Sequence, residues 1–292
     1  MAEPLIRSIS DTARWVAYHR ATESERADAI FRDPYARRLA GERGELIAGK
    51  LKQNAWAIAV RTYLFDKAIL GLLSREPVDM VVNLAAGLDS RPYRLELSPS
   101  LKWVEVDLEE ILGPKREMLS SEKPCCQLDV INQHLGDEAE RRRLFSQLNQ
   151  RAGNVLVVSE GLLGYLDEDK VTSLAADLHA QSHFQYWLAE VVSPKVLKMI
   201  NRKWEHHFKA ANAPMTFAPA DWRKFYRDRG WEMVEFDDIA QTAYKMNREP
   251  GMMKAFRVVG DIFPSWGAKQ AKIWESGVAL LRRVEEYEVT PE

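Results

Sequence analysis

Residues 81–107 decide the fold of this chain, and they read VVNLAAGLDSRPYRLELSPSLKWVEVD. A short apolar run breaks at Gly87, and a second, alternating run over residues 101–106 stops at Asp107. We interpret the stretch as a strand, a turn, a short helical segment and a second strand. In doubly wound α/β domains, a nucleotide-like ligand lies in the crevice at the carboxyl ends of such strands. The 20 residues from Gly87 to Asp107 suit a glycine that lets a ligand approach the backbone and a carboxylate that accepts both hydroxyls of a ribose.

The loop between these strands contains a single glycine, Gly87, after Ala85 and Ala86, so it matches neither GxGxxG nor GxxxxGKS. A pyrophosphate would need more bare backbone, which disfavours nicotinamide and flavin dinucleotides. A nucleoside without phosphates, such as S-adenosylmethionine, would need less. The pattern alone also leaves open an ordinary turn between a strand and a helix that ends in glycine.

The composition shows no strong charge bias. The chain has 292 residues and a formal net charge of -2, enough for one elaborated α/β domain or a domain with a cap. No basic field is present to attract phosphate backbones, so we expect no nucleic-acid partner. Apolar runs such as residues 68–73 are too short to span a membrane, and the first residues lack a basic segment followed by an apolar one. We therefore expect a cytoplasmic protein with no membrane association.

The cysteines and histidines do not form a recognisable metal site. Cys125 and Cys126 are adjacent, so they make neither a loop-closing disulfide nor a zinc site, and we interpret them as strand residues in a reducing compartment. His179 and His183 stand four residues apart, but no third ligand is evident. We expect no metal.

Residues 10–26 predict a helix with two different faces. One face is small and ends in Arg20, whereas the other carries Trp15, Tyr18 and His19. Either one face packs on the domain while the other lines a pocket, or the aromatic residues are simply part of the core.

A longer helix is predicted over residues 53–73, with Ile58 and Phe65 on its buried stripe. Arg61 falls on the same stripe. Because an unpaired buried charge is costly, its guanidinium group needs an anion. The pattern leaves two options open, a carboxylate of the protein or the carboxylate of a bound amino-acid moiety.

Strands and helices then alternate, which is typical of a parallel sheet with helices on both faces. The expected strands cover residues 78–84, 101–106, 125–130, 155–159 and 184–192, and the expected helices cover residues 108–120, 137–149 and 167–181. After Pro194 we expect helices over residues 195–210 and 221–229, and then strands over residues 231–236 and 277–284 that form an antiparallel edge. Residues 1–76 would form an N-terminal helical cap on a core of residues 77–292, in which residues 194–230 form a helical lid.

Three sequence motifs follow one another in an informative order. Residues 11–13, 19–26 and 31–36 read DTA, HRATESER and FRDPYA, residues 83–92 read NLAAGLDSRP, and residues 159–166 read SEGLLGYL. Together they resemble the leucine carboxyl methyltransferase family of S-adenosylmethionine-dependent O-methyltransferases, in particular its bacterial small-molecule branch. The resemblance covers most of the chain up to about residue 192. It implies a Rossmann-like class I methyltransferase with a mostly parallel seven-stranded sheet, and S-adenosyl-L-methionine as the methyl donor.

The resemblance also implies a cofactor site, whose acids stand after successive strands. An isolated acid at such a position also often caps the next helix. By similarity, Arg20 and Arg61 hold the methionine carboxylate, Ala85 and Gly87 allow the amino-acid tail to approach, Asp107 and Leu108 hold the ribose, Asp129 and Val130 hold the adenine, and Glu160 and Gly161 face the ammonium group and the methyl-transfer site. Ala85 departs from the pattern, because it replaces the first glycine of the family's loop.

The nature of the methyl acceptor decides whether the reaction needs a general base. A carboxylate is ionised at neutral pH and needs none, whereas a phenol or alcohol usually needs a histidine or carboxylate within hydrogen-bond reach. We name Tyr18, His19, Tyr165 and His206 as candidates for the acceptor pocket or the base, with Trp204 as a further part of an aromatic wall.

We therefore predict an O-methyltransferase that acts by in-line displacement on a carboxyl or phenolic hydroxyl group of a small molecule, such as a polyketide of secondary metabolism. A homodimer is compatible with this prediction. Two alternatives stay open. One is a protein C-terminal carboxyl methyltransferase, and the other is a non-catalytic partner protein that binds S-adenosylmethionine.

Overall fold

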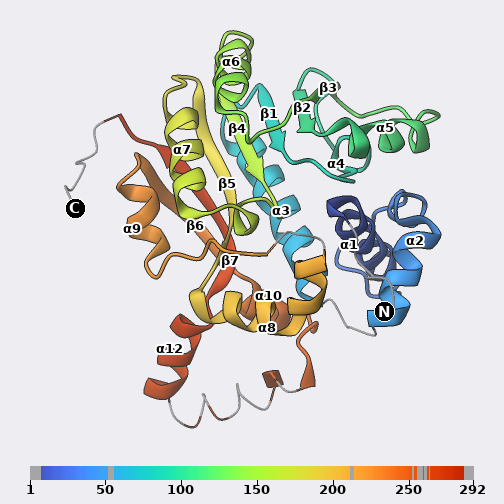
Figure 1. Ribbon diagram of the computed structural model, residues 1–292, viewed down its shortest axis with the longest axis vertical. Helices are drawn as coiled ribbons and strands as arrows, with labels where there is room; N and C mark the ends of the chain where they lie inside the picture. The colour runs from blue at the N-terminus through green and yellow to red at the C-terminus, as the bar shows by residue number, and fades with distance from the viewer. Residues whose placement is uncertain are drawn as a thin grey trace.

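Figure 1 shows the computed structural model, in which helices lie on both faces of one twisted sheet. It describes residues 8–51, 56–210, 214–251, 253–254, 259, 262 and 264–285. Within these residues the sheet has seven strands, in the order β3-β2-β1-β4-β5-β7-β6. The strands are β1 (Met80–Leu84), β2 (Lys102–Asp107), β3 (Gln127–Asn132), β4 (Val155–Ser159), β5 (Phe184–Val192), β6 (Trp231–Asp238) and β7 (Ser276–Arg283). The predicted α/β architecture is confirmed.

The first five strands are parallel, so their carboxyl ends meet at one edge of the sheet. β1 lies between β2 and β4, and the order of the strands reverses there. Every residue of β1 and β4 is buried. Their Val-rich sequences are the near-continuous apolar runs expected of strands covered on both faces. A ligand crevice is expected outside the carboxyl ends at such a reversal.

The last two strands form an antiparallel pair at the edge of the sheet, as predicted. β7 is inserted between β5 and β6 and runs antiparallel to both. Gly277 permits this close approach, because a Cβ at that position would lie 2.2 Å from the carbonyl oxygen of Asp237. The edge strand is therefore β6, although β7 comes later in the chain.

Two helical layers cover the sheet (Figure 1). The helices are α1 (Ile9–Ser24), α2 (Ala36–Leu51), α3 (Trp56–Arg75), α4 (Arg91–Arg94), α5 (Glu109–Met118), α6 (Glu138–Asn149), the 3-10 helix η1 (Leu163–Tyr165), α7 (Glu168–His179), α8 (Pro194–Ala210), α9 (Trp222–Arg227), α10 (Ile239–Lys245) and α12 (Pro264–Ile273). On one face, Phe65 of α3 packs with Val81 and Leu156. On the other, Phe145 of α6 and Tyr226 of α9 belong to a second core.

The N-terminal helices α1 and α2 form a cap beside the sheet rather than on one of its faces (Figure 1). They join α5 through an apolar cluster that includes Ala17, Leu39 and Ile111. Gly44 lets the two helices approach closely, because a Cβ there would lie 2.6 Å from the carbonyl oxygen of Arg14. The N-terminal helical cap is confirmed, whereas the boundary at residue 76 and the lid over residues 194–230 stay predictions.

Candidate functional site

A cavity of about 2210 Å³ opens at the carboxyl ends of the parallel strands. It is lined by the residues that follow β1, β2, β3 and β4, and by the last residues of β5. α1, α3, α8 and α10 contribute the surrounding walls. One small ligand usually occupies roughly 300–1,000 Å³. The cavity therefore has room for a cofactor and a second molecule.

The loop after β1 turns through two residues in the left-handed region. Ala85 has a φ of 54° and Gly87 a φ of 53°. Glycine adopts such angles readily, whereas in a residue with a Cβ this conformation costs roughly 1–2 kcal/mol of conformational free energy. Ala85 therefore stands where the backbone favours the glycine of the family's loop. Both residues line the cavity, and their predicted contact with a cofactor stays a prediction.

Asp107 ends β2 and holds this loop. Its Oδ2 accepts a hydrogen bond of 2.7 Å from the N–H of Gly87, and its Oδ1 accepts one of 2.7 Å from the N–H of Leu108. Burial raises the pKa of Asp107, and the two backbone hydrogen bonds oppose that rise. A carboxylate offers about four lone-pair sites. Both oxygens therefore keep capacity for two hydroxyls of a ligand.

Glu160 follows β4 and meets two guanidinium groups. Its Oε1 lies 2.9 Å from Nε of Arg61, and its Oε2 lies 2.8 Å from Nη1 of Arg91. Burial by itself would raise the pKa of Glu160, but the charges of Arg91 and Arg61 outweigh it and hold the pKa below its usual value. Glu160 is therefore an ionised carboxylate at the cavity wall.

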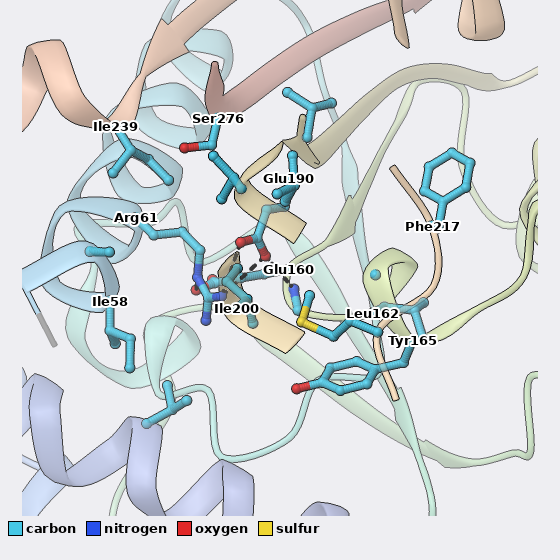
Figure 2. A pocket seen from close by; sticks show the side chains of 18 of the residues that line it. Ile58, Arg61, Glu160, Leu162, Tyr165, Glu190, Ile200, Phe217, Ile239 and Ser276 are labelled. Atoms are coloured by element: carbon cyan, nitrogen blue, oxygen red, sulfur yellow. Dashed lines mark hydrogen bonds and ion pairs between the residues drawn. The ribbon is translucent and has the colours of Figure 1, made fainter. Parts of the chain in front are cut away.

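Glu190, near the end of β5, completes this cluster (Figure 2). Its oxygens lie 3.2 and 3.1 Å from Nη1 of Arg61, and its Oε2 accepts a 3.1 Å hydrogen bond from the N–H of Gly161. Gly161 has a φ of 67°, in the left-handed region that glycine adopts readily. In this structure, the carboxylates of Glu160 and Glu190 are thus the anions that pair with the guanidinium group of Arg61.

Sequence reasoning missed Glu190 and Arg91 as cavity residues. A signal for Glu190 was available, because it is the one charged residue in the apolar run FQYWLAEVV of β5. Arg91 belongs to the motif after β1, yet it is 3% exposed and contacts Asp89, Asp66 and Glu160. Such multiple pairing depends on strands that are distant in sequence, so spacing could not reveal it.

Arg20 lines the cavity from α1, on the small face of that helix, together with Thr12, Ala13 and Val16. Its Nε donates to Asp33 Oδ2 at 2.9 Å, and its Nη2 donates to the carbonyl oxygen of Leu88 at 2.5 Å. The guanidinium group is therefore held at the loop after β1, where it remains available to a ligand carboxylate.

The predicted end of the third strand was wrong. The residues predicted to contact the adenine therefore do not lie at the end of that strand. β3 continues to Asn132, so Asp129 lies inside the strand and pairs with Arg151 at 2.8 Å, both about half exposed. Neither Asp129 nor Val130 is among the described residues that line the cavity. Gln133 and His134, directly after β3, line it instead. The reason is the register, in which Asp107 of β2 stands beside Asn132 rather than beside Asp129.

Not all residues of the aromatic face of α1 line the cavity. Tyr18 packs in the cluster of α1, α2 and α5, with the guanidinium carbon of Arg37 4.8 Å from its ring centroid. His19 stands edge-on to Trp15 and Tyr18, and burial lowers its pKa to about 4. Among the described cavity residues, neither Tyr18 nor His19 is present. A neutral, partly buried imidazole away from the cavity is a poor candidate for the base.

Tyr165 does line the cavity, in a largely apolar part of its wall. Figure 2 shows Tyr165, Leu162 and Phe217 to one side of the cluster of Arg61, Glu160 and Glu190. Burial raises the pKa of the Tyr165 hydroxyl, so it is neutral at physiological pH. His206 and Trp204 belong to α8, but their side chains lie outside the described part of the structure. Their roles stay predictions.

Neither a metal site nor a membrane-spanning helix is found in the described residues. No cluster of three or more His, Cys, Asp or Glu side chains in that part of the chain is arranged to hold a metal ion. No helix there combines the length and the apolar character that a membrane crossing requires.

Comparison with known proteins agrees with this geometry. The model of the family described as leucine carboxyl methyltransferase matches residues 13–179, more than half of the chain. A proposed S-adenosyl-L-methionine-dependent methyltransferase of Mycobacteroides abscessus is 33% identical over 59% of this chain and 61% of its own length. A relative of the same description from Mycobacterium sp. (strain KMS) is 30% identical over 77% of this chain and 83% of its own. The chain thus spans less than two thirds of the length of the first of these relatives.

The fold has solved counterparts. The crystal structure of a proposed methyltransferase from Thermobifida fusca superposes with a TM-score of 0.62 at 12% identity, and the match covers 96% of each chain. At that identity the likeness concerns the fold alone, which is that of class I methyltransferases.

Proposed function

This chain belongs to the leucine carboxyl methyltransferase family, and from that premise we propose that it binds S-adenosyl-L-methionine and transfers the methyl group to an oxygen atom of a small molecule. The observation that carries the proposal is the cavity itself. It brings Asp107, Glu160 and the left-handed loop at Gly87 to one edge of a parallel sheet. The relatives named as S-adenosyl-L-methionine-dependent methyltransferases support the choice of cofactor.

The residues present fit this cofactor. The loop after β1 contains one glycine and no lysine, which suits a nucleoside better than a pyrophosphate. Asp107 retains lone pairs for the ribose hydroxyls. The carboxylates of Glu160 and Glu190 suit a ligand that carries positive charge, and the guanidinium groups of Arg20 and Arg61 suit its carboxylate. We assign the adenine to the segment that begins at Gln133.

The acceptor would occupy the apolar side of the cavity, beside Leu162, Tyr165 and Phe217 (Figure 2). Among the described cavity residues the one histidine is His134, which follows β3. A carboxylate acceptor, already ionised at neutral pH, needs no base. We therefore favour a carboxylic acid with an apolar body, of the kind found in secondary metabolism, over a phenol.

S-adenosyl-L-methionine, when bound, supplies an already activated methyl group. The protein's own residues would then bind, orient and exclude water. Holding two reacting groups in line converts a bimolecular step into an effectively unimolecular one, which can supply about 7–11 kcal/mol of the barrier. The apolar wall and the charged cluster, on adjacent sides of the cavity, are suited to that positioning.

Isothermal titration of the purified protein with S-adenosyl-L-methionine, and separately with S-adenosyl-L-homocysteine, tests the proposal. We expect saturable binding of both. A radiolabelled methyl donor then identifies acceptors, with apolar carboxylic acids screened before phenols. Turnover of a carboxylic acid should be nearly flat between about pH 6 and 8. Absence of binding by both nucleosides would refute the proposed cofactor.

A further inference from the structure

The cavity extends from the ends of the strands into the hydrophobic core on the α6 and α9 face of the sheet. Some of the residues that line the cavity are members of this core or pack against it. A molecule that fills this part of the cavity therefore meets core side chains. We call six of these residues the inner wall: Leu162, Leu166, Leu174, Phe217, Trp222 and Tyr226.

Tyr226 is fixed in the inner wall by the packing of its ring. Helix α9 carries Trp222, Phe225 and Tyr226 at positions i, i+3 and i+4, so the three side chains share its buried face. The Tyr226 ring stands edge-on to Trp187 of β5 and to Phe225, with the ring centroids 5.3 Å apart in both pairs. Aromatic pairs prefer this edge-to-face arrangement. The position of the hydroxyl group is therefore set before any ligand enters.

The hydroxyl group of Tyr226 is buried and has no hydrogen-bond partner among the described residues. Its polar neighbours in the same core are paired. Nε1 of Trp187 donates to Oγ of Ser159 at 2.8 Å, and Nε1 of Trp231 donates to the carbonyl oxygen of Ala175 at 3.1 Å. An unpaired buried hydroxyl group is costly, and phenylalanine would fill the same space without that cost. The hydroxyl group is thus suited to a partner that enters the cavity.

The surroundings of this hydroxyl group define the chemistry of such a partner. Burial raises the pKa of Tyr226, and the charge of Arg229 opposes that rise only in part. The group is therefore a neutral hydrogen-bond donor at physiological pH. Because the inner wall is apolar, a charged group would be costly there. A neutral oxygen atom, such as that of a ketone, an ether or an alcohol, meets both conditions.

We propose that Tyr226 is a specificity-determining residue, whose hydroxyl group donates a hydrogen bond to a neutral oxygen atom on the apolar body of the methyl acceptor. The inference rests on the proposed function and deepens it, because the acceptor then carries an oxygenated body in addition to its carboxylate. A site that hydrogen-bonds its substrate discriminates against an analogue without the bonding group, since the buried group of the site then stays unpaired. An acid with a pure hydrocarbon body should therefore bind more weakly.

Titration of the purified protein, saturated with S-adenosyl-L-homocysteine so that no methyl transfer occurs, tests this inference. The probes are decanoic acid and a series of oxodecanoic acids in which the keto group moves one carbon at a time along the chain. We expect at least one oxodecanoic acid to bind the wild-type protein about tenfold more tightly than decanoic acid, a factor that corresponds to about 1.4 kcal/mol. If no member of the series binds more tightly than decanoic acid, the inference is wrong.

Tyr226→Phe then identifies the residue. The variant keeps the ring and its packing, so the preference for the oxo acid should disappear while the affinity for decanoic acid stays the same. The melting temperature of the ligand-free protein should not fall, because the hydroxyl group has no partner among the described residues. A lower melting temperature would show that the hydroxyl group is bonded within the protein, and it would overturn the inference. So would a preference that persists in the variant, or an equal loss of affinity for both kinds of acid.

Tyr35→Phe is the matched control. The hydroxyl group of Tyr35 donates a 3.5 Å hydrogen bond to the carbonyl oxygen of Tyr93, and Tyr35 is not among the described residues that line the cavity. The preference for the oxo acid should therefore stay as in the wild type. Failure of S-adenosyl-L-homocysteine to bind the wild type would refute the proposed function itself. If S-adenosyl-L-homocysteine binds but neither decanoic acid nor any oxodecanoic acid does, the proposed acceptor class is wrong and the inference falls with it.

Discussion

The backbone N–H of Gly87 donates a 2.7 Å hydrogen bond to the carboxylate of Asp107, 20 residues later in the chain. This bond ties the loop after β1 to the end of β2. Because the same carboxylate also accepts the N–H of Leu108, it orders both segments that would contact a nucleoside. Asp107 therefore has a structural role as well as its proposed role toward the ligand.

Replacement of Asp107 should affect both roles. We expect Asp107→Ala to weaken cofactor binding by about 1–3 kcal/mol, the range for losing hydrogen bonds to a charged group. Asp107→Asn retains one oxygen acceptor, so its affinity for the cofactor should fall less than that of Asp107→Ala. Calorimetric titration measures both variants, and an unchanged affinity in Asp107→Ala would remove this residue from the site.

Arg61 should matter for stability in the absence of any ligand. Arg61→Met leaves Glu160 and Glu190 without their shared partner, and we expect the free energy of unfolding to fall by about 3 kcal/mol, at the low end for breaking a buried ion pair because the pair is partly exposed. Adding Glu160→Gln and Glu190→Gln to this variant should restore most of the loss. Urea unfolding provides the measurement. The control is Lys67→Met on the same helix. Lys67 forms a half-exposed ion pair with Asp237, which should contribute less than about 1 kcal/mol to the free energy of unfolding. Equal losses of unfolding free energy in Arg61→Met and Lys67→Met would contradict the role of Arg61.

Ala85 and Ala86 should respond to glycine in opposite ways. Ala85 has a φ of 54°, so Ala85→Gly relieves roughly 1–2 kcal/mol of left-handed strain. Glycine also has greater conformational freedom in the unfolded chain, and this opposing effect lowers the stability by roughly 0.5–1 kcal/mol. We expect a net stabilisation of about 0.5–1 kcal/mol by combining these two effects. Ala86, whose φ is not positive, should only lose stability on the same change, and thermal unfolding compares the two; a destabilised Ala85→Gly protein would show that the loop is not strained.

The observed register of β3 predicts which side chain meets the adenine. Asp129→Ala should leave cofactor affinity within about 0.5 kcal/mol of the wild type, as for other surface substitutions. Gln133→Ala, at the cavity, should weaken it measurably. The reverse result in calorimetry would restore Asp129 to the site and would require a different end for the third strand.

His19 should make the protein sensitive to acid. Burial lowers its pKa from 6.5 to about 4 in the folded protein. Between these values the unfolded chain binds the proton and the folded protein does not, so stability falls as the pH drops from about 6.5 to 4, with a slope of at most about 1.4 kcal/mol per pH unit. His19→Phe, which keeps an aromatic ring, should flatten this part of the profile. Parallel pH profiles of the wild-type and His19→Phe proteins, measured by urea unfolding, would contradict a partly buried, neutral His19.

The motif after β1 predicted its own geometry well, because a turn depends on neighbouring residues. Gly87, Asp107 and Glu160 stand at the ends of strands and line the cavity, and their roles toward a cofactor stay predictions. Asp129 does not stand at such an end, because the strand that contains it continues for three more residues, and that end depends on pairing with β2 rather than on local sequence. Tyr18 and His19 were also misplaced at the cavity, since an amphipathic pattern does not state which face of a helix meets which neighbour.

The alternation of strands and helices, the loop at Gly87 and the resemblance to the family were all determined by the sequence alone. Such features depend on residues close together in the chain. The tertiary structure alone decided that Arg61 stands between Glu160 and Glu190, residues 99 and 129 positions away from it. Ion pairs of this kind form only when β4, β5 and α3 are packed together, because the attraction between two charges depends on their distance in space and not on their distance along the chain.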